Sequence, residues 1–249
     1  MTNWQIKALI RGEIYGDRSI NMQYTGMGEK HWHPSTVYYL TDGEQNVLVD
    51  TGFGNPEETA AKQPLFELRA DESLSSLLER EAVPPAEIDT LIMTHLHWDH
   101  AGNVDLFDNQ STDIMINREA AAVAYAPPAP FGGAFLSPTH GYDPSWSDVE
   151  FTFFEGDTEI APGLQAIHTP GHTPGHVSLL VENGSTTYGL AIDVFPNYAN
   201  AEGDFHPPGT MNTLDWWESA QKLDRVSDVI VPSHDPEGPE NEWITEDNR

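Results

Sequence analysis

Hydrophobic and polar residues alternate in short runs along the first part of this chain, and turn residues separate the runs. Such runs are typical of half-buried strands. They predict strands over Gln5–Tyr15, Thr36–Leu40 and Asn46–Asp50. The third of these follows an Asp42-Gly43 turn and ends on an acidic residue and a glycine, as a buried strand running into a tight turn would.

The spacing of the hydrophobic residues changes near residue 71. Leu74, Leu77 and Leu78 recur at helical spacing, and Asp71 and Ser73 stand before them as candidate caps. The sequence therefore predicts an amphipathic helix over Asp71–Glu81, which Pro84-Pro85 ends.

The rest of the chain alternates the same two patterns. The predicted strands are Thr90–Met93, Asp113–Asn117, Val149–Phe154, Leu164–His168, His176–Val181, Ser185–Ile192 and Asp228–Val231. The predicted helices are Arg118–Ala124 and Leu214–Val226, the second with Thr213 as its N-cap. Strands and helices in alternation predict an α/β fold, and 249 residues are compatible with one domain over residues 1–249.

One segment, at about residues 127–148, breaks the pattern with many Pro and Gly residues. A long irregular stretch inside a compact domain usually has a function. Its aromatic residues, Phe131, Phe135, Tyr142 and Trp146, favour a packed lid or an intersubunit contact. The second alternative would make the protein a homodimer.

Charge narrows the range of partners. With 40 Asp+Glu against 11 Lys+Arg, the net charge is -29, and acidic residues are spread along the whole sequence. Such a surface repels phosphate backbones and anionic lipids, so we expect no nucleic acid and no membrane partner. Because molar salt would screen the self-repulsion, the composition also predicts a halophilic protein.

The absence of cysteine removes thiolate chemistry and Cys-ligated metal sites. Any metal must be held by histidines and carboxylates. No apolar run reaches the length of a signal peptide or a membrane span, so the sequence predicts a cytoplasmic protein.

The strongest chemical signal is the run His95-Leu96-His97-Trp98-Asp99-His100, directly after a predicted strand. Two histidines at i and i+2 can converge on one cation while the Asp-His pair turns toward a second. Imidazole and carboxylate ligands suit zinc. One short motif cannot complete two coordination shells, and His172, Asp193 and His234 stand where later strands end, which is where sites in α/β folds form.

These segments resemble the metallo-β-lactamase superfamily. The resemblance runs from Val47-Leu48-Val49-Asp50-Thr51-Gly52 through residues 94–102 and 169–176 and Asp193 to Ser233-His234-Asp235. It implies an αββα sandwich with a dinuclear metal site. The implied ligands are His95, His97 and His172 for one ion, Asp99, His100 and His234 for the other, and Asp193 between them. Asp50 is implied behind the histidines, and we expect His176 to support the site in the same way.

Within the superfamily, the chain is similar to N-acyl homoserine lactone lactonases, on the run Thr169-Pro170-Gly171-His172-Thr173-Pro174-Gly175-His176 and the complete ligand set. The similarity implies that hydroxide held between two zinc ions attacks the ester carbonyl of a lactone, with Asp99 moving a proton. Iron, manganese and cobalt are the alternative ions. These lactonases generally carry a tyrosine three residues after the bridging aspartate, where this chain has Pro196. Either Tyr198 stabilises the oxyanion instead, or the substrate differs from theirs.

Acyl-chain recognition would need an apolar cleft. Segments that could border it contain Trp32, Phe131, Phe135 and Phe195, together with Met27 and Phe205. His31 and His33, beside Trp32, suggest the mouth of the cleft.

Other reactions on the same scaffold stay open. A hydroxyacylglutathione thioesterase is disfavoured because the last quarter of the chain offers only Lys222, Arg225 and Arg249 to bind glutathione carboxylates. A broad esterase or phosphotriesterase and an iron-dependent oxygenase are further alternatives. Serine hydrolysis has little support, because no Gly-x-Ser-x-Gly motif is present.

Overall fold

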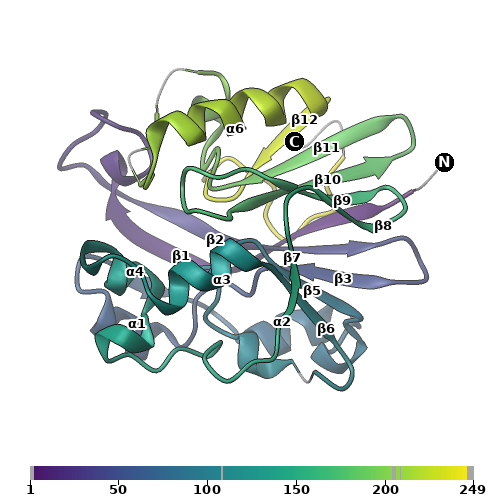
Figure 1. Cartoon of the computed structure of the whole chain (residues 1–249), viewed down its shortest axis with the longest axis horizontal. Coiled ribbons are helices and arrows are strands. Elements are labelled where there is room, and N and C mark those ends of the chain that lie inside the picture. Colours follow the sequence, from purple (N-terminus) through teal and green to yellow (C-terminus); the bar gives the residue numbers. More distant parts are fainter. Residues whose placement is uncertain (1–2, 108, 204–205, 208, 246–249) are drawn as a thin grey trace.

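Two β-sheets packed face to face form the centre of the molecule (Figure 1). The computed structural model describes residues 3–107, 109–203, 206–207 and 209–245. Within these residues, one sheet has seven strands in the order β4-β1-β2-β3-β5-β6-β7, and the other has five in the order β12-β11-β10-β9-β8. The described helices include none that is long and apolar enough to span a bilayer.

The larger sheet consists of β1 (Gln5–Asp17), β2 (Lys30–Thr41), β3 (Asn46–Val49), β4 (Glu67–Arg69), β5 (Thr90–Met93), β6 (Asp113–Asn117) and β7 (Thr152–Phe154). The smaller sheet consists of β8 (Thr158–Ala161), β9 (Leu164–His168), β10 (Val177–Asn183), β11 (Thr186–Ile192) and β12 (Val229–Pro232). The helices are α1 (Pro56–Lys62), α2 (Leu74–Arg80), α3 (Arg118–Tyr125), α4 (Gly132–Phe135), α5 (Tyr198–Ala201) and α6 (Thr213–Val226).

The buried side chains define four layers. Tyr38 and Val49 of the larger sheet pack against Leu179 and Leu190 of the smaller one, which fills the space between the sheets. The outer face of the larger sheet is covered by α2 and α3, and α6 covers the smaller sheet, as Figure 1 shows. The fold is therefore the expected αββα sandwich.

Most predicted elements are present, with corrections at their ends. The helix predicted over Asp71–Glu81 is α2, and the Ser73 side chain caps it by accepting from the Ser76 N–H. The prediction of Thr213 as the N-cap of α6 is wrong. The Asn212 side chain accepts from the Leu214 and Asp215 N–H groups instead, because Thr213 already lies in the helix.

The irregular segment at residues 127–148 contains more structure than its composition predicts. Short 3-10 turns flank α4, which ends at Leu136 in the left-handed conformation. Phe135 and Trp146 are fully buried in the core beneath the larger sheet. The segment is thus packed onto its own chain.

The strand directions bring several loops to one edge. β3, β5 and β6 run parallel to one another in the larger sheet, and β11 runs parallel to β12 in the smaller one. The carboxyl ends of β3, β5, β11 and β12 are followed directly by Asp50, the histidine-rich loop, Asp193 and Ser233-His234. Chemistry-bearing side chains from distant parts of the sequence therefore meet there.

Candidate metal centre

Two groups of metal-ligand residues lie side by side at this edge. In the first, ligand atoms of His95, His97, His172 and Asp193 all lie within 4.8 Å of one another, and the same holds for Asp99, His100 and His234 in the second. All seven residues are those that the sequence singles out. Since imidazole nitrogen and carboxylate oxygen are the usual ligands of zinc and related ions, each group can hold one divalent cation.

Asp193 connects the two groups. Its Oδ1 lies 3.2 Å from His234 Nε2 and 3.4 Å from His100 Nε2. Its Oδ2 lies 3.1 Å from His172 Nε2 and 3.9 Å from His95 Nε2. One carboxylate oxygen thus faces each group, which is the arrangement that a ligand shared by two ions requires.

The first group is electrically suited to a cation. Burial, with neighbouring histidines adding to it, lowers the pKa of His95 and His97 well below the ordinary value, and burial lowers the pKa of His172. Neutral imidazoles present lone pairs. His172 Nε2 lies only 2.9 Å from His97 Nδ1, and the buried His95 Nε2 has no hydrogen-bond partner among the described residues. Buried neutral imidazole nitrogens that converge in this way, together with the Asp193 carboxylate, fit a metal ion.

The second group attracts positive charge more strongly. Burial lowers the pKa of His100, but the carboxylates of Asp193 and Asp99 outweigh it and raise that pKa well above the ordinary value. His234 shows the same balance, with its pKa raised by Asp193 against burial. A pair of carboxylates that stabilises a proton on a buried imidazole also stabilises a divalent ion at the same place.

Asp50 holds His100 in position. Its Oδ2 lies 2.9 Å from His100 Nδ1, and its Oδ1 accepts from the Thr94 N–H at 2.9 Å. A carboxylate on the far nitrogen fixes the ring so that Nε2 points into the site. Asp50 itself has a φ of 62°, and the Thr51 N–H donates to the His100 carbonyl at 2.7 Å, so the two loops are joined.

That junction requires glycine at position 102. The Gly102 N–H donates to the Gly52 carbonyl at 2.7 Å, and a Cβ on Gly102 would come within 2.1 Å of the Gly54 nitrogen. The histidine-rich loop can therefore lie this close to the turn after β3 only without a side chain there.

Two further contacts orient ligands. His234 Nδ1 lies 2.7 Å from the Pro34 carbonyl, to which it can donate, leaving Nε2 for the site. His176 is fully buried, its pKa is lowered by burial to about 3, and its Nε2 accepts from the Asp193 N–H at 3.4 Å. His176 is in neither ligand group and lies behind Asp193.

We expect Asp50→Asn to weaken metal binding by about 10- to 100-fold, the usual cost of losing a carboxylate that orients a ligand histidine. Asparagine tolerates the positive φ at this position, and its amide oxygen can still accept from the Thr94 N–H, so the main change is the loss of the carboxylate oxygen that faces His100. Metal titration of the purified variant measures the effect. Unchanged affinity would mean that His100 is oriented by other contacts.

A cavity of about 280 Å³ opens over the metal-ligand residues. Phe131 lines it, as predicted, beside His97, Asp99, His172, Asp193 and His234. Sequence reasoning missed most of its other walls, which are formed by Ile14, Ile20, Asn21, Phe66, Trp98, Ala134, Pro196, Pro207, Gly209, Thr210 and Met211. His33 also lines this cavity, as its position beside Trp32 suggested. We call this space the metal cavity.

Three aromatic residues expected at the substrate site lie elsewhere. Phe195 is buried under α6 with Trp216. The Trp32 ring packs against the Tyr15 ring with centroids 5.0 Å apart, and the Phe135 ring packs against the His97 ring with centroids 4.5 Å apart. Neither Trp32 nor Phe135 lines the metal cavity. Each is used for packing. Met27 is exposed, and Phe205 lies outside the described residues.

Tyr198 also lines a different cavity, together with His31 and Asp235. Its N–H donates to the Asp235 carboxylate at 2.8 Å as α5 begins. The pKa of Tyr38 is raised well above the ordinary value, first by burial and then by Tyr198. Pro196 lines the metal cavity instead.

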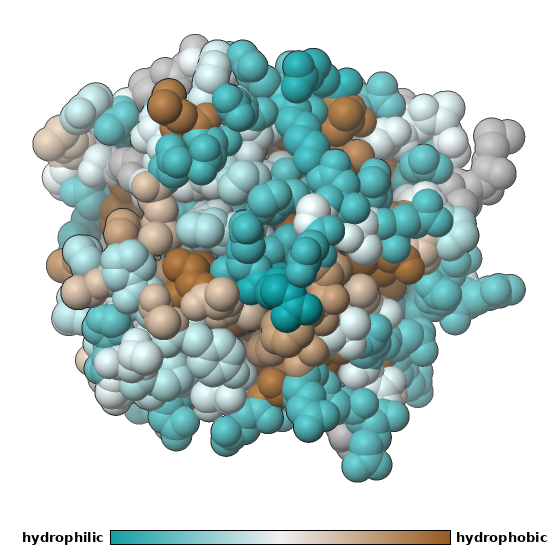
Figure 2. Space-filling model, viewed as in Figure 1, coloured by the Kyte–Doolittle hydropathy of each residue, from teal (hydrophilic) through white to brown (hydrophobic). Residues whose placement is uncertain are grey.

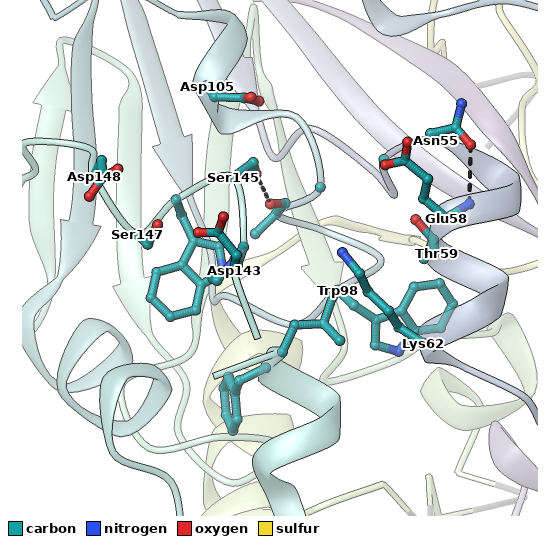
Figure 3. Close-up of a pocket in the computed structure, with 17 residues that line it drawn as sticks. Asn55, Glu58, Thr59, Lys62, Trp98, Asp105, Asp143, Ser145, Ser147 and Asp148 are labelled. Carbon is teal, nitrogen blue, oxygen red and sulfur yellow. Dashed lines mark hydrogen bonds between the residues drawn. The ribbon is translucent and has the colours of Figure 1, made fainter. Parts of the chain in front are cut away.

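Another cavity, of about 380 Å³, has Trp98 in its wall (Figure 3). Glu58, Thr59 and Lys62 from the α1 region face the segment that carries Asp143, Ser147 and Asp148 across it. None of the seven metal-ligand residues lines it, so we place the chemistry in the metal cavity.

A four-layer α/β fold with two histidine groups joined by one carboxylate at the strand ends defines a metal-dependent hydrolase. Residues 32–234 match the metallo-beta-lactamase superfamily, and the chain belongs to it.

An N-acyl homoserine lactonase from a Bacillus species is 32% identical over 80% of this chain and 77% of its own length. The structure is similar to that of a Bacillus thuringiensis AiiA mutant with N-decanoyl-L-homoserine bound at the active site, at 25% identity and a TM-score of 0.81 over 98% of this chain and 100% of the other. A lactone hydrolase with N-hexanoyl-L-homoserine bound at its catalytic metal center gives 26% identity and a TM-score of 0.82 over the same shares.

Proposed function

We propose that this protein opens the lactone ring of N-acyl homoserine lactones, using two divalent metal ions. The observation that carries the proposal is Asp193, whose two oxygens face two histidine groups at the base of a largely apolar cavity. The names of the similar lactonases support the same substrate class. An uncharged ester also suits a chain of net charge -29 better than a polyanion does.

His95, His97 and His172 would hold one ion and Asp99, His100 and His234 the other, with Asp193 binding both. Zinc is the preferred ion for this set of nitrogen and oxygen ligands, and iron, manganese and cobalt are alternatives. Two such ions supply Lewis acidity that activates water and polarises an ester carbonyl.

Asp99 is the residue placed to move the proton. Its Oδ2 lies 3.9 Å from both His100 Nε2 and His234 Nε2, and the residue lines the metal cavity. When the attacking water loses a proton and the ring C–O bond breaks, a carboxylate here can accept that proton and return it to the leaving alkoxide oxygen. The product is then a hydroxy acid.

We expect Tyr198→Phe to keep kcat/KM within about threefold of the wild type, because its side chain lines another cavity. An oxyanion donor would instead cost about 10²- to 10³-fold in kcat. Steady-state kinetics with one lactone distinguish the two outcomes, and a loss of that size would return Tyr198 to the oxyanion role.

Four further proposals rest on the sequence. The chain acts as one domain over residues 1–249, with the segment at 127–148 contributing Phe131 to the metal cavity. It needs no nucleic acid or membrane partner, since its surface is strongly acidic. The cytoplasmic location stays a prediction, and so does a homodimer through the segment at 127–148.

A pH-stat assay in concentrated salt tests the function. The panel contains N-acyl homoserine lactones, γ- and δ-lactones, a thioester and a phosphotriester, with metal content measured on the same sample. We expect the highest kcat/KM for the N-acyl homoserine lactones. Faster turnover of the thioester or the phosphotriester would replace the proposal with one of those activities.

A further inference from the structure

Two side chains that line the metal cavity each carry a buried nitrogen atom that has no hydrogen-bond partner within the described residues. These atoms are Asn21 Nδ2 and His33 Nδ1, on side chains that belong to residues 8% and 4% exposed. A buried donor without a partner destabilises the folded state, so such groups need an explanation. Neither residue belongs to the metal-ligand groups.

The backbone holds both side chains in place. Asn21 follows the 3-10 turn after β1, where its N–H donates to the Arg18 carbonyl and its own carbonyl accepts from Asn200 Nδ2. His33 lies on β2 directly opposite Ile14 of β1. The neighbouring Pro34 carbonyl accepts from His234, so His33 is tied to the ligand loop. The two groups are therefore preorganised beside the metal-ligand residues.

The His33 ring is buried in the cavity wall and can donate from one of its nitrogens. It meets the edge of the His234 ring, with centroids 5.8 Å apart. A neutral imidazole keeps one N–H. Asn21 contributes an amide N–H, and nearby walls of the cavity are apolar, formed by Ile14, Ile20, Phe66, Phe131 and Met211.

We propose that Asn21 and His33 determine specificity by donating hydrogen bonds to the amide carbonyl oxygen of an N-acyl homoserine lactone. The inference rests on the proposed function. The ring carbonyl of that substrate must reach the metal-ligand residues, and its amide carbonyl is the next acceptor along the molecule, followed by an apolar chain. The metal cavity contains the three kinds of group that this substrate requires, which are metal-ligand residues, side chains with N–H donors and apolar side chains.

The alternative hydrogen-bond partner of these two donors is a bound water molecule that has no part in substrate recognition. It would satisfy the nitrogens equally well, but it would not distinguish a substrate with an amide from one without.

The experiment compares N-hexanoyl homoserine lactone with γ-decalactone, an alkyl lactone that lacks the amide. We expect His33→Leu and Asn21→Leu each to raise KM for the first substrate about tenfold, the effect of one buried donor, and to lower the ratio of the two kcat/KM values by a similar factor. His33→Gln keeps an N–H donor and should recover most of the ratio. Phe131→Leu is the matched control, because an apolar wall residue should affect both substrates alike and leave the ratio unchanged.

Two further readouts do not depend on turnover. Calorimetric binding of the product N-hexanoyl-L-homoserine should weaken about tenfold in His33→Leu, while metal content stays at the wild-type value. The thermal midpoint of the His33→Leu variant should be no lower than that of the wild type, because the substitution removes an unpaired buried donor.

Equal losses for the two lactones, or a loss of metal, would overturn the inference and make the pair a support for the metal site. No loss for either lactone would assign the donors to a bound water only. If the wild type hydrolyses γ-decalactone but not the N-acyl homoserine lactone, the proposed function fails first and the inference with it.

Discussion

Replacing Asp193 with asparagine is expected to lower kcat/KM for lactones by at least about 10³-fold and to cost the protein at least one metal ion. The carboxylate contributes one oxygen to each histidine group, at 3.2 Å from His234 Nε2 and 3.1 Å from His172 Nε2. Asparagine keeps the shape but has one oxygen and no charge. Several kcal/mol of charge stabilisation would be lost, and each 1.36 kcal/mol is a tenfold change in rate.

The fold should tolerate this change. The Asp193 N–H reaches His176 Nε2, and Ser233 Oγ donates to Asp193 Oδ1, a contact that an amide oxygen can still accept. Asp224→Asn, on the exposed face of α6, is the matched control and should keep full activity and metal. If Asp193→Asn retained both ions and wild-type turnover, the bridging role would be wrong.

The second large effect concerns salt. We propose that the net charge of -29 makes the folded state dependent on concentrated salt. The Debye length falls from about 10 Å at 0.1 M to about 3 Å at 1 M, which removes most of the repulsion between surface carboxylates. Figure 2 shows hydrophilic residues over much of the visible face, with apolar residues in smaller patches.

We expect the thermal midpoint to rise by roughly 10 °C or more between 0.1 M and 2 M NaCl, which corresponds to about 3–5 kcal/mol for a domain of this size. Differential scanning calorimetry measures it. Sucrose is the control, because it strengthens burial without screening charge. The combined variant Glu44→Gln, Glu218→Gln and Asp224→Asn, at exposed positions, should need less salt than the wild type. Equal midpoints at both salt concentrations would rule out salt adaptation.

The sequence singles out the seven residues that the structure brings together in two groups, because the chemistry of these residues is local. Four of the residues lie within the six residues from His95 to His100, and the others directly follow strands or stand in a turn between strands. The turn after β3 likewise places Asp50 where one hydrogen bond reaches His100. Short patterns of rare residue types are visible without knowledge of long-range packing.

The cavity wall is different, because it depends on contacts between distant segments. Ile14 and His33 meet through the pairing of β1 with β2, while Met211 comes from the chain between α5 and α6. Nothing in the immediate surroundings of Ile14 or Met211 in the sequence separates them from ordinary core residues, and only the position of His33 beside Trp32 suggested its place. Tyr198 shows that closeness in sequence does not bring a residue into the same cavity. It lies only two positions after Pro196, which lines the metal cavity, but Tyr198 lines another cavity.

The short elements were missed for a similar reason. α1, β4, β8 and α5 have at most seven residues each, too few for a periodic pattern to stand out. Their formation depends on local caps such as Asn55, which accepts from two N–H groups of α1, and on strand pairing with β1 and β9.

The most direct test of the central claim is a metal titration of the metal-free protein, followed by hydrolysis of N-hexanoyl homoserine lactone in concentrated salt. Chelation should abolish turnover, and zinc should restore it up to two equivalents per chain, with no further gain beyond that. Full activity at one equivalent, or turnover that survives chelation, would contradict a two-metal lactonase.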